Sequence, residues 1–182
     1  MPKSKRPRKP YRGARQTYAS FRLLEQPAQE ALANLREQFN EVSLAVELKL
    51  PRGTCSDTDL TLMGDMIRWG ITASACRTWC TDESRIDVYK VVHDGAMYLT
   101  QLQYRGRKRG DRFVATGQEL EAIRTAFDFV GPYLQQSLTE CPIQTLKEYQ
   151  VTREMIKPQG LGKPAVWRAE DLRRAVKNYK VK

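Results

Sequence analysis

Histidine is almost missing from this sequence, since His93 is the single imidazole among 182 residues. A glycine-rich phosphate loop, a nucleophile elbow and a metalloprotease helix motif are missing too. Histidine-based acid–base catalysis and multi-histidine metal sites therefore have little to work with. Carboxylate pairs such as Asp57 and Asp59 fall near predicted helix starts, where the helix dipole favours acids. We predict a protein that is not an enzyme and has no cofactor.

Long apolar runs are missing as well. No stretch approaches the ~20 apolar residues that span a bilayer. A secretory signal peptide has an apolar segment after its basic start, and no such segment follows the basic start of this chain. We expect a soluble, cytoplasmic protein without membrane contact.

Cysteine is scarce and scattered, at Cys55, Cys76, Cys80 and Cys141. This usage fits a reducing compartment better than a disulfide scaffold. Cys76 and Cys80 lie one helical turn apart, and with His93 and a third cysteine they could form a zinc site. Zinc motifs usually place closer pairs on loops, so we predict partly buried free thiols and no metal. His93 lies beside an apolar stripe, where a hydrogen-bonded structural role is the more common one.

Apolar residues instead recur at helical spacing over most of the chain. The segments predicted to be helical are 27–50, 57–79, 82–103, 116 to about 134, 142–155 and 167–178. Apolar and polar residues alternate over 42–50 as in a strand, but Ala, Glu, Lys and Leu favour helix there. Ser56 or Asp57 caps one helix, and Thr116 with Glu119 forms a capping box for another.

These patterns predict an all-α fold, an antiparallel helical bundle of four to five helices with basic N- and C-terminal arms. Residues 1–16 have too few aliphatic side chains to form a core, so we predict a disordered basic arm. Residues 17–156 would form the bundle domain. Residues 157–182 would form a linker and a short basic C-terminal helix.

Positive charge is abundant and unevenly distributed. The formal net charge is +10, yet residues 1–22 alone carry +8, residues 104–112 carry +4 and residues 157–182 carry +6. The rest of the chain is therefore acidic. Basic patches on an acidic body indicate localised contact with a polyanion.

The cations of these patches are the candidate nucleic-acid-binding residues. Arginine offers bidentate contacts to phosphate, and Tyr11 and Tyr104 could stack on unpaired bases. The candidates are Lys3, Lys5, Arg6, Arg8, Lys9, Arg12, Arg15, Arg105, Arg107, Lys108, Arg109, Arg112, Arg173, Arg174 and Lys177. The stretch YRGRKRGDR, residues 104–112, is predicted to be a connection between two long helices. A merely solvated connection is the competing interpretation of this stretch.

No base-reading module is present, so we expect mostly sequence-independent contact with DNA or RNA. The segments RPRKPYR and RGRKRGDRFVATGQEL resemble those of small helical proteins encoded in proteobacterial phages and prophages. The resemblance implies a mobile-element setting and no site residues. We therefore predict a nucleic-acid-binding accessory or regulatory protein of a phage or other mobile element. The alternatives are a protein-binding inhibitor of a host nucleic-acid machine and a DNA-processing enzyme with unrecognised carboxylates.

Overall fold

The computed structural model describes residues 26–77, 82–155 and 168–180. The predicted arm 1–16, with Tyr11 and seven of the candidate cations, lies outside the described residues, and so does most of the predicted linker. The described residues form α2 (Gln26–Leu44), η1 (Ala45–Lys49), α3 (Asp57–Cys76), α4 (Asp82–Lys108), α5 (Gly117–Glu140), α6 (Pro142–Met155) and α7 (Ala169–Asn178). No strand occurs among them, so the all-α prediction is confirmed. Six α-helices are described, where the sequence predicted a bundle of four to five.

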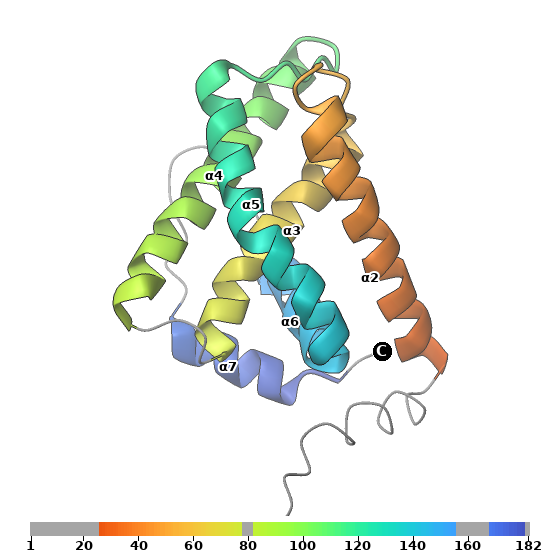
Figure 1. Ribbon diagram of the computed structural model, residues 1–182, viewed down its shortest axis with the longest axis vertical. Coiled ribbons are helices and arrows are strands. Elements are labelled where there is room, and N and C mark those ends of the chain that lie inside the picture. Colours follow the sequence, from red (N-terminus) through yellow and green to blue (C-terminus); the bar gives the residue numbers. More distant parts are fainter. Residues whose placement is uncertain (1–25, 78–81, 156–167, 181–182) are drawn as a thin grey trace, which may run out of the picture.

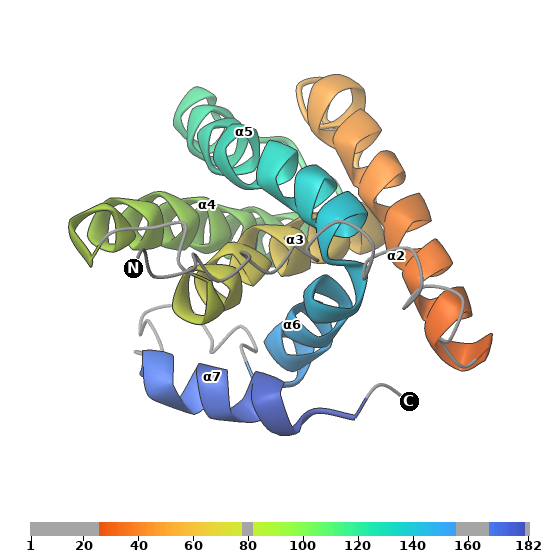
Figure 2. The ribbon, with the colours of Figure 1, turned by 60° about the horizontal axis from the view of Figure 1, so that its bottom comes forward.

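Helix α3 lies at the centre of the molecule (Figures 1 and 2). It begins in a capping box, in which the side chains of Ser56 and Asp59 each accept a hydrogen bond from the other residue's backbone N–H. Of the two predicted caps, Ser56 and Asp57, the N-cap is therefore Ser56. From Met63 to Ala75 every residue is buried. Helices α2, α4, α5, α6 and α7 all contact α3. Most of this segment is apolar, as a helix covered on all sides requires. Its buried polar side chains pair instead, since Arg68 donates to Asp65 over 3.0 Å and Thr152 of α6 donates to Thr72 over 2.8 Å.

The alternating segment 42–50 is helical, so the strand alternative is wrong. It ends α2 and forms the single π-helical turn η1. The Leu50 N–H donates to the Ala45 carbonyl over 2.8 Å, which is the i to i−5 bond of a π-helix. The wider turn keeps Val42, Val46 and Leu50 buried in the core.

Helix α4 is longer than the sequence indicated. It runs through Lys108, so residues 104–108 of the basic stretch are helical and only residues 109–116 form the connection. Its end is a Schellman turn, in which the Asp111 N–H donates to the Gly106 carbonyl over 3.0 Å and Gly110 has a φ of 70°. The glycine in the stretch KRGDR is therefore required by the turn.

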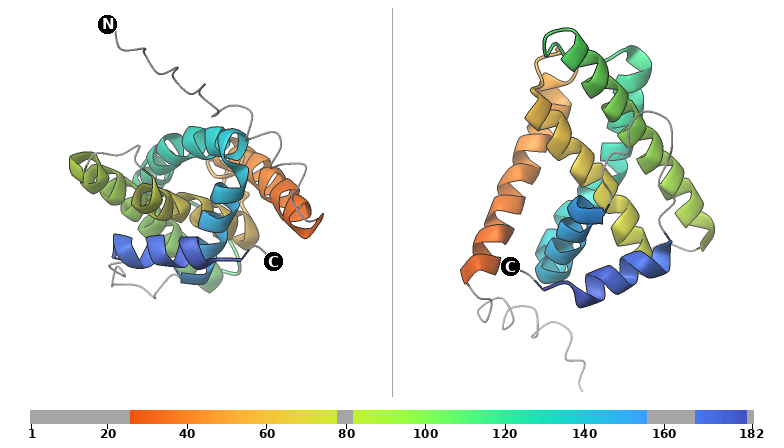
Figure 3. Two further views of the ribbon diagram at one scale, coloured as in Figure 1. Left: turned by 90° about the horizontal axis from the view of Figure 1, so that it is seen from below. Right: turned by 180° about the vertical axis from the view of Figure 1, so that it is seen from behind.

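Helix α7 lies across the opposite end of the molecule from the α4–α5 connection (Figures 1 and 3). Leu172 and Val176 are buried, and α7 contacts α3 and α6. The Tyr179 hydroxyl donates to Glu154 of α6 over 2.8 Å. The C-terminal helix predicted as part of a basic arm is therefore packed against the helical body.

Candidate nucleic-acid interface

The basic stretch lies where the C-terminal end of α4 meets the N-terminal ends of α3 and α5. The turn before α3 lies beside the α4–α5 connection, because a Cβ at Gly53 would approach Val114 Cγ2 to 3.1 Å. The Gln103 side chain of α4 donates to the Thr61 hydroxyl of α3 over 2.9 Å. Two connections far apart in the sequence thus form one end of the molecule, at the top of Figure 1.

Arg105 is bound by Glu119, the residue that caps α5. Its Nη1 and Nη2 atoms donate to the two carboxylate oxygens over 2.5 and 2.6 Å, and Nη2 also donates to the Val114 carbonyl over 2.8 Å. Glu119 is buried, and its hydrogen bonds to Arg105 hold its pKa below the ordinary value. Arg105 therefore holds the connection to the start of α5, and its guanidinium is not free for a phosphate.

Arg107 forms a second ion pair, with Asp57 at the start of α3. Its Nε and Nη2 atoms donate to the carboxylate over 3.0 and 2.8 Å. The hydrogen bond to Asp57 raises the pKa of Arg107. The Arg107 side chain remains 60% exposed, so solvent and salt screen this pair more than the Arg105 pair.

Gly106, between these two arginines, allows close packing. A Cβ at this position would lie 2.1 Å from a carbon of the Phe113 ring, far inside van der Waals contact. Phe113 is 1% exposed, so its ring fixes the connection to the surface of α4. The sequence RGR thus places one glycine against the core and two arginines toward the neighbouring helix starts.

The remaining cations of the stretch are exposed. Lys108 Nζ lies 4.2 Å from the centroid of the Tyr104 ring, a cation–π contact on the surface of α4. Within the described part of the chain, Arg109 and Arg112 have no side-chain hydrogen bond or ion pair. The structure thus separates the five predicted cations of this stretch into two that are held by carboxylates and three that face solvent.

Arg52 joins this end of the molecule, although sequence reasoning did not single it out. It is exposed in the turn before α3, next to Gly53, which contacts Phe113 and Val114. Its place could not be found from the sequence, because the turn and the α4–α5 connection are about sixty residues apart. We name Arg52, Lys108, Arg109 and Arg112 the α4–α5 basic surface.

The three predicted cations of α7 lie at the other end of the molecule and are all exposed. Arg173 Nε donates to the Ala75 carbonyl over 2.5 Å and so satisfies a carbonyl at the end of α3. Arg174 and Lys177 have no ion pair within the described residues. We name Arg174 and Lys177 the α7 basic surface.

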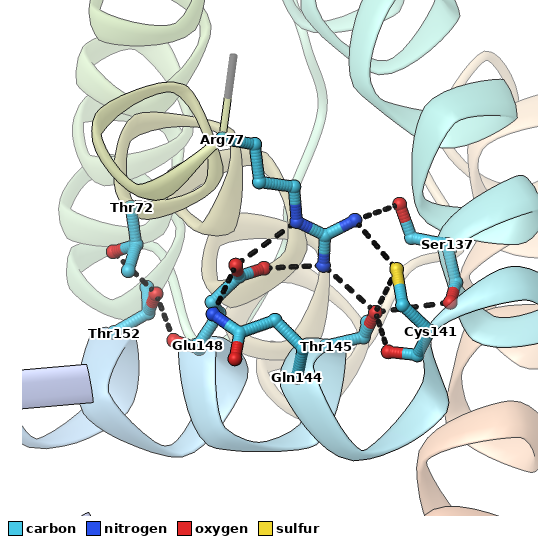
Figure 4. A network of polar contacts seen from close by, with 8 residues as sticks. All are labelled: Thr72, Arg77, Ser137, Cys141, Gln144, Thr145, Glu148 and Thr152. Atoms are coloured by element: carbon cyan, nitrogen blue, oxygen red, sulfur yellow. Dashed lines mark hydrogen bonds and ion pairs between the residues drawn. The ribbon is translucent and has the colours of Figure 1, made fainter. Parts of the chain in front are cut away.

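Arg77, which no sequence motif indicated, is a mostly buried cation at the end of α3 (Figure 4). It donates to Glu148 through Nε and Nη2, over 2.9 and 2.5 Å. Nη1 donates to Ser137 Oγ and Cys141 Sγ, and Nη2 also donates to Thr145 Oγ1. All five guanidinium N–H groups are therefore used.

Glu148, in turn, is completely buried. Burial opposes the charged form of Arg77, but the hydrogen bonds to Glu148 outweigh it and raise the pKa of Arg77. The Arg77 guanidinium also lies 5.5 Å from the Trp69 ring centroid and 5.6 Å from the Tyr133 centroid. Because no donor is left over, this network joins the end of α3 to α5 and α6 and has no free group to bind a ligand.

The described cysteines are buried or partly buried. Cys55, Cys76 and Cys141 carry free thiols, whereas Cys80 lies outside the described residues. Burial raises the pKa of Cys55 and of Cys76 to about 11, so both are protonated near neutral pH. Within the described part of the chain, no group of histidine, cysteine and acidic residues is arranged to hold a metal ion. His93 stacks on Tyr89, with 6.0 Å between ring centroids.

None of the helices described here has an apolar stretch long enough to cross a membrane. Comparison with protein-family models, with curated proteins and with solved structures finds no match to this chain.

Proposed function

We propose that this protein binds nucleic acid through its phosphates, as an accessory or regulatory protein. The observation that carries the proposal is the α4–α5 basic surface. After the internal ion pairs of Arg105 and Arg107 are formed, Arg52, Lys108, Arg109 and Arg112 remain exposed at one end of the molecule. An accessory role in a phage or other mobile element rests on the resemblance of the basic segments alone.

The rigidity of the connection supports a binding role. The Schellman turn, the buried Phe113 ring and the Arg105–Glu119 pair hold residues 109–116 against α4 and α5. A cation on a fixed backbone loses less conformational entropy on binding a phosphate than a cation on a free chain. Arginine also matches the geometry of a phosphate with two parallel hydrogen bonds. The surface is therefore suited to phosphate contact rather than to base recognition.

The structure changes which residues should be substituted to test this proposal. Arg105 supports the buried carboxylate of Glu119, so its removal would alter stability together with binding. Arg109 and Arg112 have no such partner in the described part of the chain. Both are positions at which charge can be removed without breaking a described contact.

The test is a fluorescence-anisotropy titration of a labelled DNA duplex, and in parallel of an RNA duplex, over a range of salt concentrations. Each phosphate neutralised on B-DNA contributes about −0.9 to the slope of log affinity against log salt. We expect the double variant R109A/R112A to bind more weakly and to lower the magnitude of the slope by about two. The matched control is K90A/R124A, which removes two other exposed cations.

Equal affinity and equal slope for R109A/R112A and the native protein would contradict the proposal, and so would the absence of binding at low salt. An equal loss in K90A/R124A would show that net charge alone, rather than the α4–α5 basic surface, sets the affinity. Circular dichroism melting of each variant checks that the fold is kept.

A further inference from the structure

The α4–α5 and α7 basic surfaces lie at opposite ends of the central helix. Arg107, in the last turn of α4, pairs with Asp57, the first residue of α3. Arg173 of α7 donates to the carbonyl of Ala75, next to the last residue of α3. At a rise of 1.5 Å per residue these two contacts are about 27 Å apart along the α3 axis. Figure 1 shows the α4–α5 connection and α7 at the two ends of the molecule.

The two cations of the α7 basic surface, Arg174 and Lys177, face away from the helical body. Leu172 and Val176 are buried, which fixes the inward side of the helix. Arg174 is two residues from each of them and therefore projects from the opposite side, with Lys177 one turn farther on. The two acids of α7, Glu170 and Asp171, lie in its first turn, so the charged residues of its C-terminal half are all basic.

The surface between the two ends carries exposed charges of both signs. Glu37 of α2 and Asp128 of α5 are exposed near the middle of their helices, and Arg36 and Arg124 are exposed on the same two helices. Helices α2 and α5 are neighbours, since Phe39 and Phe127 stack with 6.2 Å between ring centroids. This side is therefore not continuously basic, as binding of one nucleic acid from end to end would require.

We propose that the protein bridges two separate segments of nucleic acid, one held at the α4–α5 basic surface and the other at the α7 basic surface. This inference rests on the proposed function and adds a second binding surface to it. Two outward-facing basic ends, separated by a surface of mixed charge, favour two segments over one continuous segment. The arrangement makes each surface sufficient for binding and both surfaces necessary for bridging.

A bead-capture experiment tests this directly. One DNA duplex is fixed on beads, the protein is added, and retention of a second, fluorescent duplex is measured. We expect the native protein to retain the second duplex, and R174A/K177A and R109A/R112A each to lose at least three-quarters of that retention. Each variant should still bind a single duplex in the anisotropy titration. K90A/R124A should retain the second duplex as the native protein does.

The outcomes separate the two proposals. Native protein that binds a single duplex but retains no second duplex overturns bridging and leaves the proposed function intact. Native protein that binds no duplex overturns both. Unchanged retention by R174A/K177A also overturns bridging through α7. The molar mass of the free protein, from light scattering, must be that of one chain at the protein concentration used, because a dimer that carried one surface per chain would also bridge and would contradict the inference.

Discussion

The two ends of α3 both meet arginines, but the surroundings differ. At its C-terminal end, Arg77 uses all five N–H groups inside a network with a completely buried Glu148. At its N-terminal end, Arg107 shares an exposed ion pair with Asp57, and its neighbours Arg109 and Arg112 face solvent. Arginine thus joins packed helices at one end of α3 and carries an exposed charge at the other.

Burial explains the difference. A guanidinium removed from water loses its hydration, and only complete replacement by protein acceptors makes that tolerable. An exposed guanidinium keeps its hydration and gains little from one carboxylate. The number of guanidinium N–H donors that are bound by protein acceptors therefore distinguishes an arginine that stabilises the fold from one that is available to a ligand. Five substitutions test this comparison and the packing around it, in order of decreasing expected effect.

Removing Arg77 should have the largest effect. We expect R77A to lower the free energy of unfolding by about 3–5 kcal/mol, because Glu148 would be left charged and unpaired in the core. Urea denaturation followed by circular dichroism measures the loss. In the double variant R77L/E148L no buried charge is left over, so it should be more stable than R77A. A double variant less stable than R77A would contradict this explanation.

Filling the space at Gly106 should come next. We expect G106A to cost about 1–3 kcal/mol, since the added Cβ would overlap the buried Phe113 ring. The matched control is G117A, at the first residue of α5, where an added Cβ meets nothing within 4 Å. Thermal melting of the two variants gives the comparison. A loss in G117A as large as that in G106A would exclude packing against Phe113 as the cause.

Removing Arg105 should be less costly than removing Arg77 and should depend on pH. We expect R105A to lose about 1–2 kcal/mol at neutral pH, because the buried Glu119 keeps only its capping bonds to Thr116. Arg105 lowers the pKa of Glu119 in the folded protein, whereas an unfolded glutamate titrates near about 4.3. The stabilisation is therefore present above about pH 4.3 and is lost as the pH falls through the lower folded pKa.

Urea denaturation of the native protein and R105A at several pH values measures this dependence. The difference in unfolding free energy should be largest near neutral pH and should shrink below about pH 4. A difference that stays constant through this range would show that Arg105 acts by packing rather than by its charge on Glu119.

The exposed arginines should have the smallest effect on stability. We expect R107A to lose less stability than R105A, and to lose less again at high salt, because its pair with Asp57 is screened by solvent. R109A should leave the melting temperature unchanged, since no described contact is lost. Melting curves at low and high salt check both. A larger loss in R107A than in R105A would reverse the order that burial predicts.

Local signals in the sequence predicted most of the helices. The Thr116–Glu119 capping box forms as its spacing indicated, and 142–155 is helical over the predicted range. Such features depend on residues three or four positions apart, so they can be recognised without the fold. The end of α4 was misjudged, because a run of cations and glycines is typical of a connection. In the structure, Gly106 is needed for contact with Phe113, seven residues later.

The sequence by itself determined the helical class, the caps and the excess of basic residues near 104–112 and 169–178. Only the tertiary structure decided which of those basic residues are available. Arg107 finds its carboxylate fifty residues away in the chain, and Arg77 finds Glu148 seventy-one residues away. Charge is a property of composition, but its availability depends on which carboxylates the packed helices bring within hydrogen-bonding distance, and that is fixed only when α3, α4 and α6 come together.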